Sequence, residues 1–144
     1  YTFNDNAEHG QLWTPVLPGE SIVIEAEMPA SVADQFVLVI GQVNSGYRDV
    51  LRQGFPNPDK QGSCNIDVIC PEANAWRNEI RSVALYSIYG IYVCTGSLII
   101  NQRQDFRAFF LTAAHCVSTT SEASSVVVYW NFQSPFCDFL CAET

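Results

Sequence analysis

The six cysteines of this 144-residue chain constrain its fold more than any other feature. They stand at positions 64, 70, 94, 116, 137 and 141. Their number is even and no paired Cys-x-x-Cys knuckles occur, which favours three disulfides over a zinc site. His115 and Cys116 are adjacent and therefore poorly placed to ligate one metal ion together. We expect a disulfide-stapled protein of an oxidising compartment, secreted or extracellular, without metal or cofactor.

The composition predicts a folded chain that avoids polyanions. Hydrophobic residues make up 48% of it and charged residues 15%, so it can bury a core. Seven Lys plus Arg against fifteen Asp plus Glu give a formal charge of -8, which repels nucleic-acid phosphates and anionic lipids. The longest apolar runs, such as Phe36–Ile40, have the length of a strand. We therefore expect no nucleic-acid partner and no membrane span.

The first 55 residues predict a small β module. Ser21–Glu27 alternates apolar and polar residues with a period of two, and Gln35–Val43 is a continuous β-branched run, so both predict strands. A third strand is expected at Tyr47–Leu51, after a turn. We expect a β-sandwich over residues 1–55. Residues 56–62 are rich in turn formers and X-Pro bonds, and they predict a linker.

Residues 63–144 predict a second all-β module. Four segments are rich in aromatic and β-branched residues and are separated by turn formers. They are Glu79–Ile88, Tyr92–Ile100, Phe106–Thr112 and Ser124–Phe132, with a turn at Tyr89-Gly90. Little sequence is left for helices, so we expect an antiparallel barrel or sandwich. Trp13, Trp76 and Trp130 are expected to be core anchors with one edge in water, and a stacking platform for sugars is the alternative.

Two motifs of this second module stand one hairpin apart. They are Cys94-Thr-Gly-Ser-Leu-Ile99 and Leu111-Thr-Ala-Ala-His-Cys116. Together they resemble the first half of trypsin-like serine proteases. Gly62–Pro71 and Val126–Asn131 narrow the resemblance to secreted bacterial proteases of the lysyl endopeptidase type. The resemblance implies that residues 63–144 form one trypsin-like half-barrel of the six-stranded type, preceded by a propeptide-like module.

The resemblance also implies roles for single residues. His115 matches the general base of the family, and Cys94 with Cys116 closes the loop around it. A bridge across that loop would hold the imidazole in one orientation. The resemblance also pairs Cys70 with Cys137. It places the family partner of Cys64 in the second half of the protease. A local bridge from Cys64 to Cys141 is the alternative.

Several parts of a serine protease cannot be identified in the sequence. Acyl transfer needs an activated Ser, oxyanion donors and a carboxylate behind the His. The usual Gly-x-Ser-Gly stretch is missing, and Ser97 has no neighbouring base in the family pattern. Asp138 only faintly resembles the catalytic Asp. His115 is therefore expected to be a vestige or half a site.

Two functions remain open. The first is a catalytically incomplete secreted protein that acts as a structural or binding module and self-assembles through exposed strand edges into an extracellular polymer. The second is a fragment of an active secreted serine endopeptidase whose Asp and Ser lie in missing sequence. Lys60, the only lysine, stands just before the segment that resembles the mature start of the family. It marks either an ancestral cleavage point or an ordinary linker.

Overall fold

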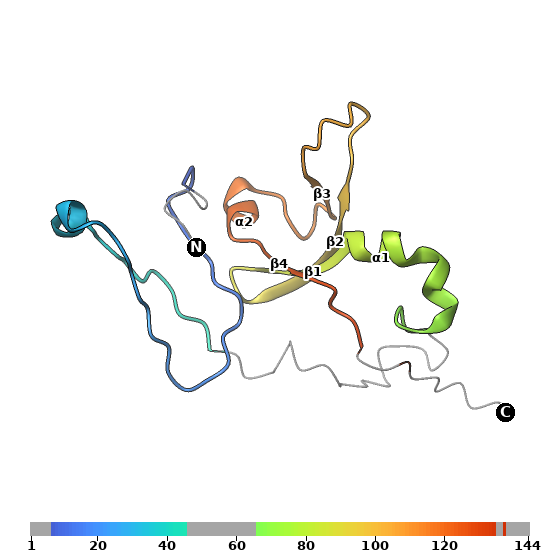
Figure 1. Cartoon of the computed structure of the whole chain (residues 1–144), viewed down its shortest axis with the longest axis horizontal. Coiled ribbons are helices and arrows are strands. Elements are labelled where there is room, and N and C mark those ends of the chain that lie inside the picture. Colours follow the sequence, from blue (N-terminus) through green and yellow to red (C-terminus); the bar gives the residue numbers. More distant parts are fainter. Residues whose placement is uncertain (1–6, 46–65, 135–136, 138–144) are drawn as a thin grey trace.

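The described residues build one four-stranded antiparallel sheet. The computed structural model describes residues 7–45, 66–134 and 137, and the strand order in its sheet is β3-β2-β1-β4 (Figure 1). The strands are β1 (Val83–Ile88), β2 (Tyr92–Ile99), β3 (Phe109–Leu111) and β4 (Val127–Trp130). Helices are few and short, so the predicted all-β class is confirmed.

The β1–β2 hairpin forms at the predicted Tyr89-Gly90 turn. Both residues have positive φ, 52° and 64°, as tight hairpins with the right-handed strand twist require. The register then pairs Ile88 with Tyr92 and Tyr86 with Cys94. Because the turn fixes this register, it places Cys94, which is bonded to the segment that carries His115, opposite the buried Tyr86.

The buried core lies along β1. Ala84, Tyr86 and Ile88 expose at most 3% of their surface. Tyr86 packs edge-on against Phe110, with ring centroids 5.5 Å apart, and Phe110 meets Trp130 at 6.0 Å in the same way. These side-chain contacts cover β1, whereas β2, which also has a partner strand on each side, stays largely exposed.

The tryptophans are less buried than expected. Trp76 is 63% exposed and Trp130 is 44% exposed, so the prediction of core anchors is wrong for Trp76 and holds only in part for Trp130. Trp13 is half-buried and packs edge-on against Tyr89, with centroids 5.7 Å apart. An indole beside the hairpin turn covers its edge but does not fill the interior.

Helices replace part of two expected strands. The 3₁₀ helix η2 (Pro71–Trp76) runs into α1 (Arg77–Ser82), where the first half of Glu79–Ile88 was expected to be extended. Pro71 is at the first position of η2, where its missing N–H costs nothing. The start of Ser124–Phe132 likewise belongs to α2 (Thr120–Ser124). β3 covers only the second half of Phe106–Thr112.

The N-terminal segment forms no strand within residues 7–45. Its one regular element is the 3₁₀ helix η1 (Ala30–Gln35). The strands predicted at Ser21–Glu27 and Gln35–Val43 are wrong for this structure: Gln35 ends η1, and no ladder joins the other residues to a described strand. Extended propensity alone does not make a strand, because a ladder needs a partner in register. Residues 46–65, with the expected Tyr47–Leu51 strand and the 56–62 linker, lie outside the described residues.

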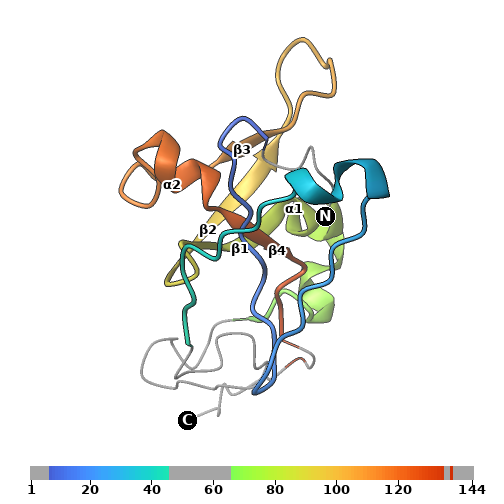
Figure 2. The same ribbon diagram turned by 90° about the vertical axis from the view of Figure 1, so that its left-hand side faces the viewer.

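Both ends of this segment contact the sheet, and its middle projects as an arm. Val16 donates its backbone N–H to the Tyr129 hydroxyl at 3.1 Å, and Gln11 donates to Ser124. Asn44 donates to the carbonyl of Tyr89 at 2.5 Å. Residues 20–43, which we call the arm, extend away from the sheet with η1 at the tip (Figures 1 and 2).

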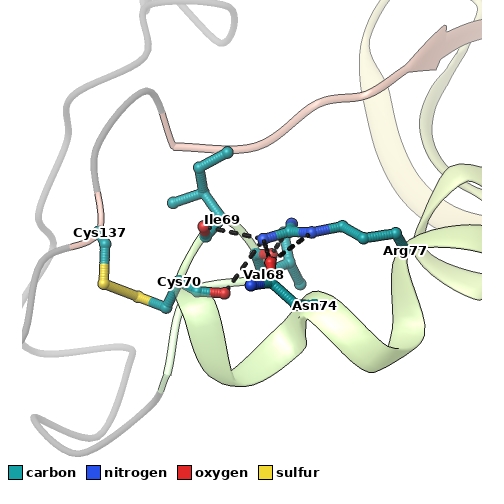
Figure 3. Close-up of a disulfide and its surroundings, with 6 residues drawn as sticks. All are labelled: Val68, Ile69, Cys70, Asn74, Arg77 and Cys137. Atoms are coloured by element: carbon teal, nitrogen blue, oxygen red, sulfur yellow. Dashed lines mark hydrogen bonds between the residues drawn. A yellow bond between two sulfur atoms is a disulfide. The ribbon is translucent and has the colours of Figure 1, made fainter.

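One arginine holds together the segment that precedes η2 and leads to the sheet. The Arg77 guanidinium donates to the carbonyls of Val68, Ile69 and Cys70 and to the Asn74 side chain, at 2.5 to 3.2 Å. Figure 3 shows this cluster beside the disulfide between Cys70 and Cys137. Cys70 is buried, so the bridge and the arginine hold the same turn from two sides. Within the described part of the chain, no helix is long and apolar enough to cross a bilayer.

Gly96 gives a first test of the packing. A Cβ at this position would clash with the Phe110 ring and lie 2.8 Å from the carbonyl oxygen of Leu111. We expect Gly96→Ala to lower the free energy of unfolding by about 1–3 kcal/mol, because an overpacked core must shift. Denaturant unfolding measures this. Gly41→Ala, where nothing lies within 4 Å, is the control, and equal stability of the two variants would contradict the packing.

Arg77 gives a second test. Arg77→Met removes the donors to three carbonyls, and we expect it to cost about 1–3 kcal/mol in the same unfolding measurement. Arg81→Met on the same helix is the matched control, because the Arg81 side chain is exposed and makes no hydrogen bond with a described residue. If both variants lose the same stability, the arginine cluster does not support the turn.

Candidate catalytic half-site

His115 lies in a turn directly after β3. Cys116 and Val117 donate their backbone N–H groups to the carbonyl of Ala113, at 2.9 and 3.3 Å, which bends the chain around the histidine. The side chain of His115 is exposed. The chain therefore presents the imidazole at the surface and does not pack it into the core.

A disulfide and a hydroxyl pair hold this turn on the sheet. Cys94 of β2 is bonded to Cys116, with 6.4 Å between their Cα atoms. On the other side of His115, the Thr112 hydroxyl donates to the carbonyl of Thr95 at 3.1 Å and lies 2.6 Å from the Tyr86 hydroxyl. Since Tyr86 is fully buried, the residues flanking His115 are fixed to the rigid centre of the sheet. Cys94–Cys116 and Cys70–Cys137 are the two pairs that the resemblance implied.

The partners of a catalytic histidine are not found among the described residues. No hydrogen bond or ion pair reaches the His115 side chain there. Ser97 lies within β2, paired with Val83 and Leu111, and it makes no bond to His115. No group of three His, Cys, Asp or Glu that suits a metal ion occurs in residues 7–45, 66–134 and 137. Lys60, Cys64, Asp138 and Cys141 lie outside the described residues.

A capping box fixes the segment that follows the His115 turn. The Thr119 hydroxyl accepts from the Glu122 backbone N–H, while the Glu122 carboxylate accepts from the backbone N–H groups of Ser118 and Thr119, each at 2.8 Å. These two backbone bonds, that of Ser118 first, and the two hydroxyls lower the pKa of Glu122 below its ordinary value of 4.5. The Thr-x-x-Glu spacing is the sequence signal for this box, and it was not among the predicted features.

The comparisons with known proteins identify the family. Residues 58–144 match the family model described as lysyl endopeptidase, C-terminal domain. The chain belongs to the lysyl endopeptidase family. A lysyl endopeptidase of Pseudomonas aeruginosa is 29% identical over 138 residues, which cover 87% of this chain and 29% of that protein. The chain thus spans less than a third of the length of this curated relative. The predicted resemblance is confirmed.

The family match covers the His115 turn and everything that holds it. The matched residues contain every described helix and strand except η1, and therefore the whole described sheet and both disulfides. The match begins at residue 58, inside the 56–62 stretch that the sequence predicts as a linker. Residues before that stretch are covered in part by the alignment with the relative.

The capping box predicts a pH-dependent contribution to stability. Because the folded protein lowers the pKa of Glu122, the ionised carboxylate stabilises the fold fully above about pH 4.5 and less as the pH falls through the lower folded value. We expect Glu122→Gln to lower the melting temperature at pH 7 and to differ less from the parent chain at pH 3. Glu72→Gln, an exposed carboxylate outside the box, is the control. A Glu122→Gln deficit that is as large at pH 3 as at pH 7 would rule out the charge as its source.

Proposed function

We propose that these residues carry the general-base half of a secreted serine endopeptidase of the lysyl endopeptidase type and do not hydrolyse peptide bonds by themselves. The observation that carries this proposal is the presentation of His115: an exposed imidazole on a turn tied to β2 by Cys94–Cys116. A general base needs a fixed orientation and access to the proton it removes. A structural histidine needs neither.

Incomplete catalysis is supported by what surrounds the imidazole. As a base, His115 would take the hydroxyl proton of a nucleophilic Ser through one ring nitrogen, while a carboxylate holds the other. None of the described residues supplies either group, and Ser97 is held inside the sheet. An imidazole without an activated hydroxyl and oxyanion donors gives little rate enhancement.

A binding or structural role is supported by the uncovered apolar surface of the sheet. β3 and β4 are its edge strands in the described residues, and each offers unpaired backbone groups. Leu111 of β3 is 58% exposed and Trp130 of β4 is 44% exposed. A closed barrel would bury such residues, so this half-barrel gains stability by binding protein, either its complementary half or another copy of itself. The two disulfides support a secreted, extracellular setting.

The alternative is a working secreted endopeptidase whose Asp and Ser come from sequence outside these 144 residues. The geometry of the His115 turn fits both functions, because the general base has the same task in each. Intact mass of the native material, non-reduced and reduced, with mapping of the peptide that contains Cys64, separates them. A bridge from Cys64 to Cys141 would support the self-contained module, and a bridge to an unknown peptide would support the endopeptidase.

A peptidase assay tests the catalytic part of the proposal. We expect the purified 144-residue chain to cleave a chromogenic lysyl amide no faster than its His115→Ala variant, and a serine-directed phosphonate probe to leave both unlabelled. The pair of variants is well matched, because His115 is exposed and its replacement should not disturb folding. Turnover that disappears in His115→Ala would show a complete site and would overturn the proposal.

A further inference from the structure

The loop between β2 and β3 is not explained by the half-site. β2 carries Cys94 near its first residue and leads into the loop at its last, so residues 100–107 lie at the opposite end of the strand from the His115 turn. We call these residues the β2–β3 loop. It projects above the sheet in Figure 1, well away from the arm. Its role is therefore separate from proton transfer at His115.

The β2–β3 loop forms a small, mostly apolar hollow. The hollow has a volume of about 330 Å³ and is lined by Ile100, Asn101, Gln104, Phe106 and Arg107. Ligand sites of proteins begin at about 300 Å³, so it suits one or two aliphatic side chains. Phe106 is fully exposed and Ile100 is 80% exposed. Phe106 and Gln104 also have positive φ, 57° and 50°, which is uncommon for such residues.

The one carboxylate of this loop is bonded to groups of the loop itself. Asp105 accepts from the Asn101 side chain at 2.7 Å and from the Arg107 backbone N–H at 3.2 Å. The Arg107 guanidinium lies over the Phe109 ring, 5.4 Å from its centroid, and no carboxylate of the described residues pairs with it. With Arg103, the loop has two arginines against one aspartate. In a chain of charge -8, it is a local positive, apolar surface.

The arm has the opposite character. Its stretch of residues 20–27 contains three glutamates and no cation, and the apolar residues among them are exposed: Ile22 by 60%, Val23 by 90% and Ile24 by 57%. Glu25 and Glu27 are exposed as well. The backbone there forms no helix and belongs to no described ladder, and it runs as a stretched-out segment in Figure 1. An extended, acidic and aliphatic segment is the kind of ligand that the β2–β3 loop fits.

We propose that the β2–β3 loop of one copy binds residues 20–27 of the arm of a second copy. Aliphatic side chains of the arm enter the hollow beside Phe106, and the glutamates face Arg103 and Arg107. The inference rests on the binding role proposed above and names its surfaces. The arm and the loop lie far apart in Figure 1, so the contact joins different copies.

The proposed contact is head-to-tail. Each copy uses its arm on one neighbour and its loop on the other, so the contact is heterologous and leaves one free arm and one free loop at the ends of every assembly. Such contacts produce open chains unless the rotation between copies closes a ring. Association should therefore continue beyond a dimer as the concentration rises.

Sedimentation velocity of the full 144-residue chain at about 0.15 M salt tests this, because charges more than about 8 Å apart are screened there. We expect the mean mass to rise with concentration beyond that of a dimer. Replacing Arg103→Glu and Arg107→Glu together should weaken association at least about tenfold, since like charges then face each other. Arg81→Glu, the same type of substitution at one exposed site on α1, should leave association unchanged.

A charge swap provides the decisive control. Glu25→Arg with Glu27→Arg should also abolish association, and mixing these arm variants with the loop variants, or combining all four substitutions in one chain, should restore it. Circular dichroism checks that each variant is folded. Association that the loop variants leave intact would overturn this inference but not the binding role, because the interface would lie elsewhere. A chain that stays monomeric at every concentration would overturn the inference, while the peptidase assay would still decide the general-base proposal.

Discussion

The covalent tie between Cys94 and Cys116 is the constraint on which the rest of this structure depends. The described part of the chain buries few hydrophobic side chains completely, and most of these lie on β1. In a domain with a small core, the free energy gained by burial is close to the conformational entropy cost of folding, so the domain is only marginally stable. Closing loops of 22 and 67 residues by disulfides removes part of that cost, about 3 to 4 kcal/mol each in the chain-entropy account. The turn that presents His115 can thus stay ordered while its imidazole is exposed.

The same arrangement explains why the half-site is rigid and yet inactive in the proposed function. The turn is oriented by the hydroxyl pair of Thr112 and the buried Tyr86 and by the Cys94–Cys116 disulfide. Reactivity would need a serine and a carboxylate that contact the imidazole. These two requirements belong to different parts of a protease, so a chain can meet the first without the second.

The sequence predicted the parts of the fold that local chemistry determines. The Tyr89-Gly90 turn, the strand at Tyr92–Ile100 and the His115 loop follow from turn residues, alternation and a specific motif. It failed where the outcome depends on a partner far away in the chain: residues 21–27 and 35–43 have strand composition but no ladder in the described residues. The two short helices were missed for another reason, because Pro71 and the Thr119-x-x-Glu122 box are start signals that the aromatic and β-branched pattern outweighed.

The two segments that were wrongly predicted as strands are also the surfaces available for binding. A run of exposed aliphatic residues on extended backbone is costly in water and prone to pair with other chains, so a stable protein must cover it. The acidic side chains of the arm limit that pairing, since two arms carrying three glutamates each in residues 20–27 repel one another. What remains favourable is a surface that is both apolar and positive. Among the described residues, Arg103 and Arg107 stand in one loop beside the fully exposed Phe106, whereas Arg77 is occupied by backbone carbonyls. The charge pattern therefore selects the partner surface, and the apolar side chains supply most of the binding free energy.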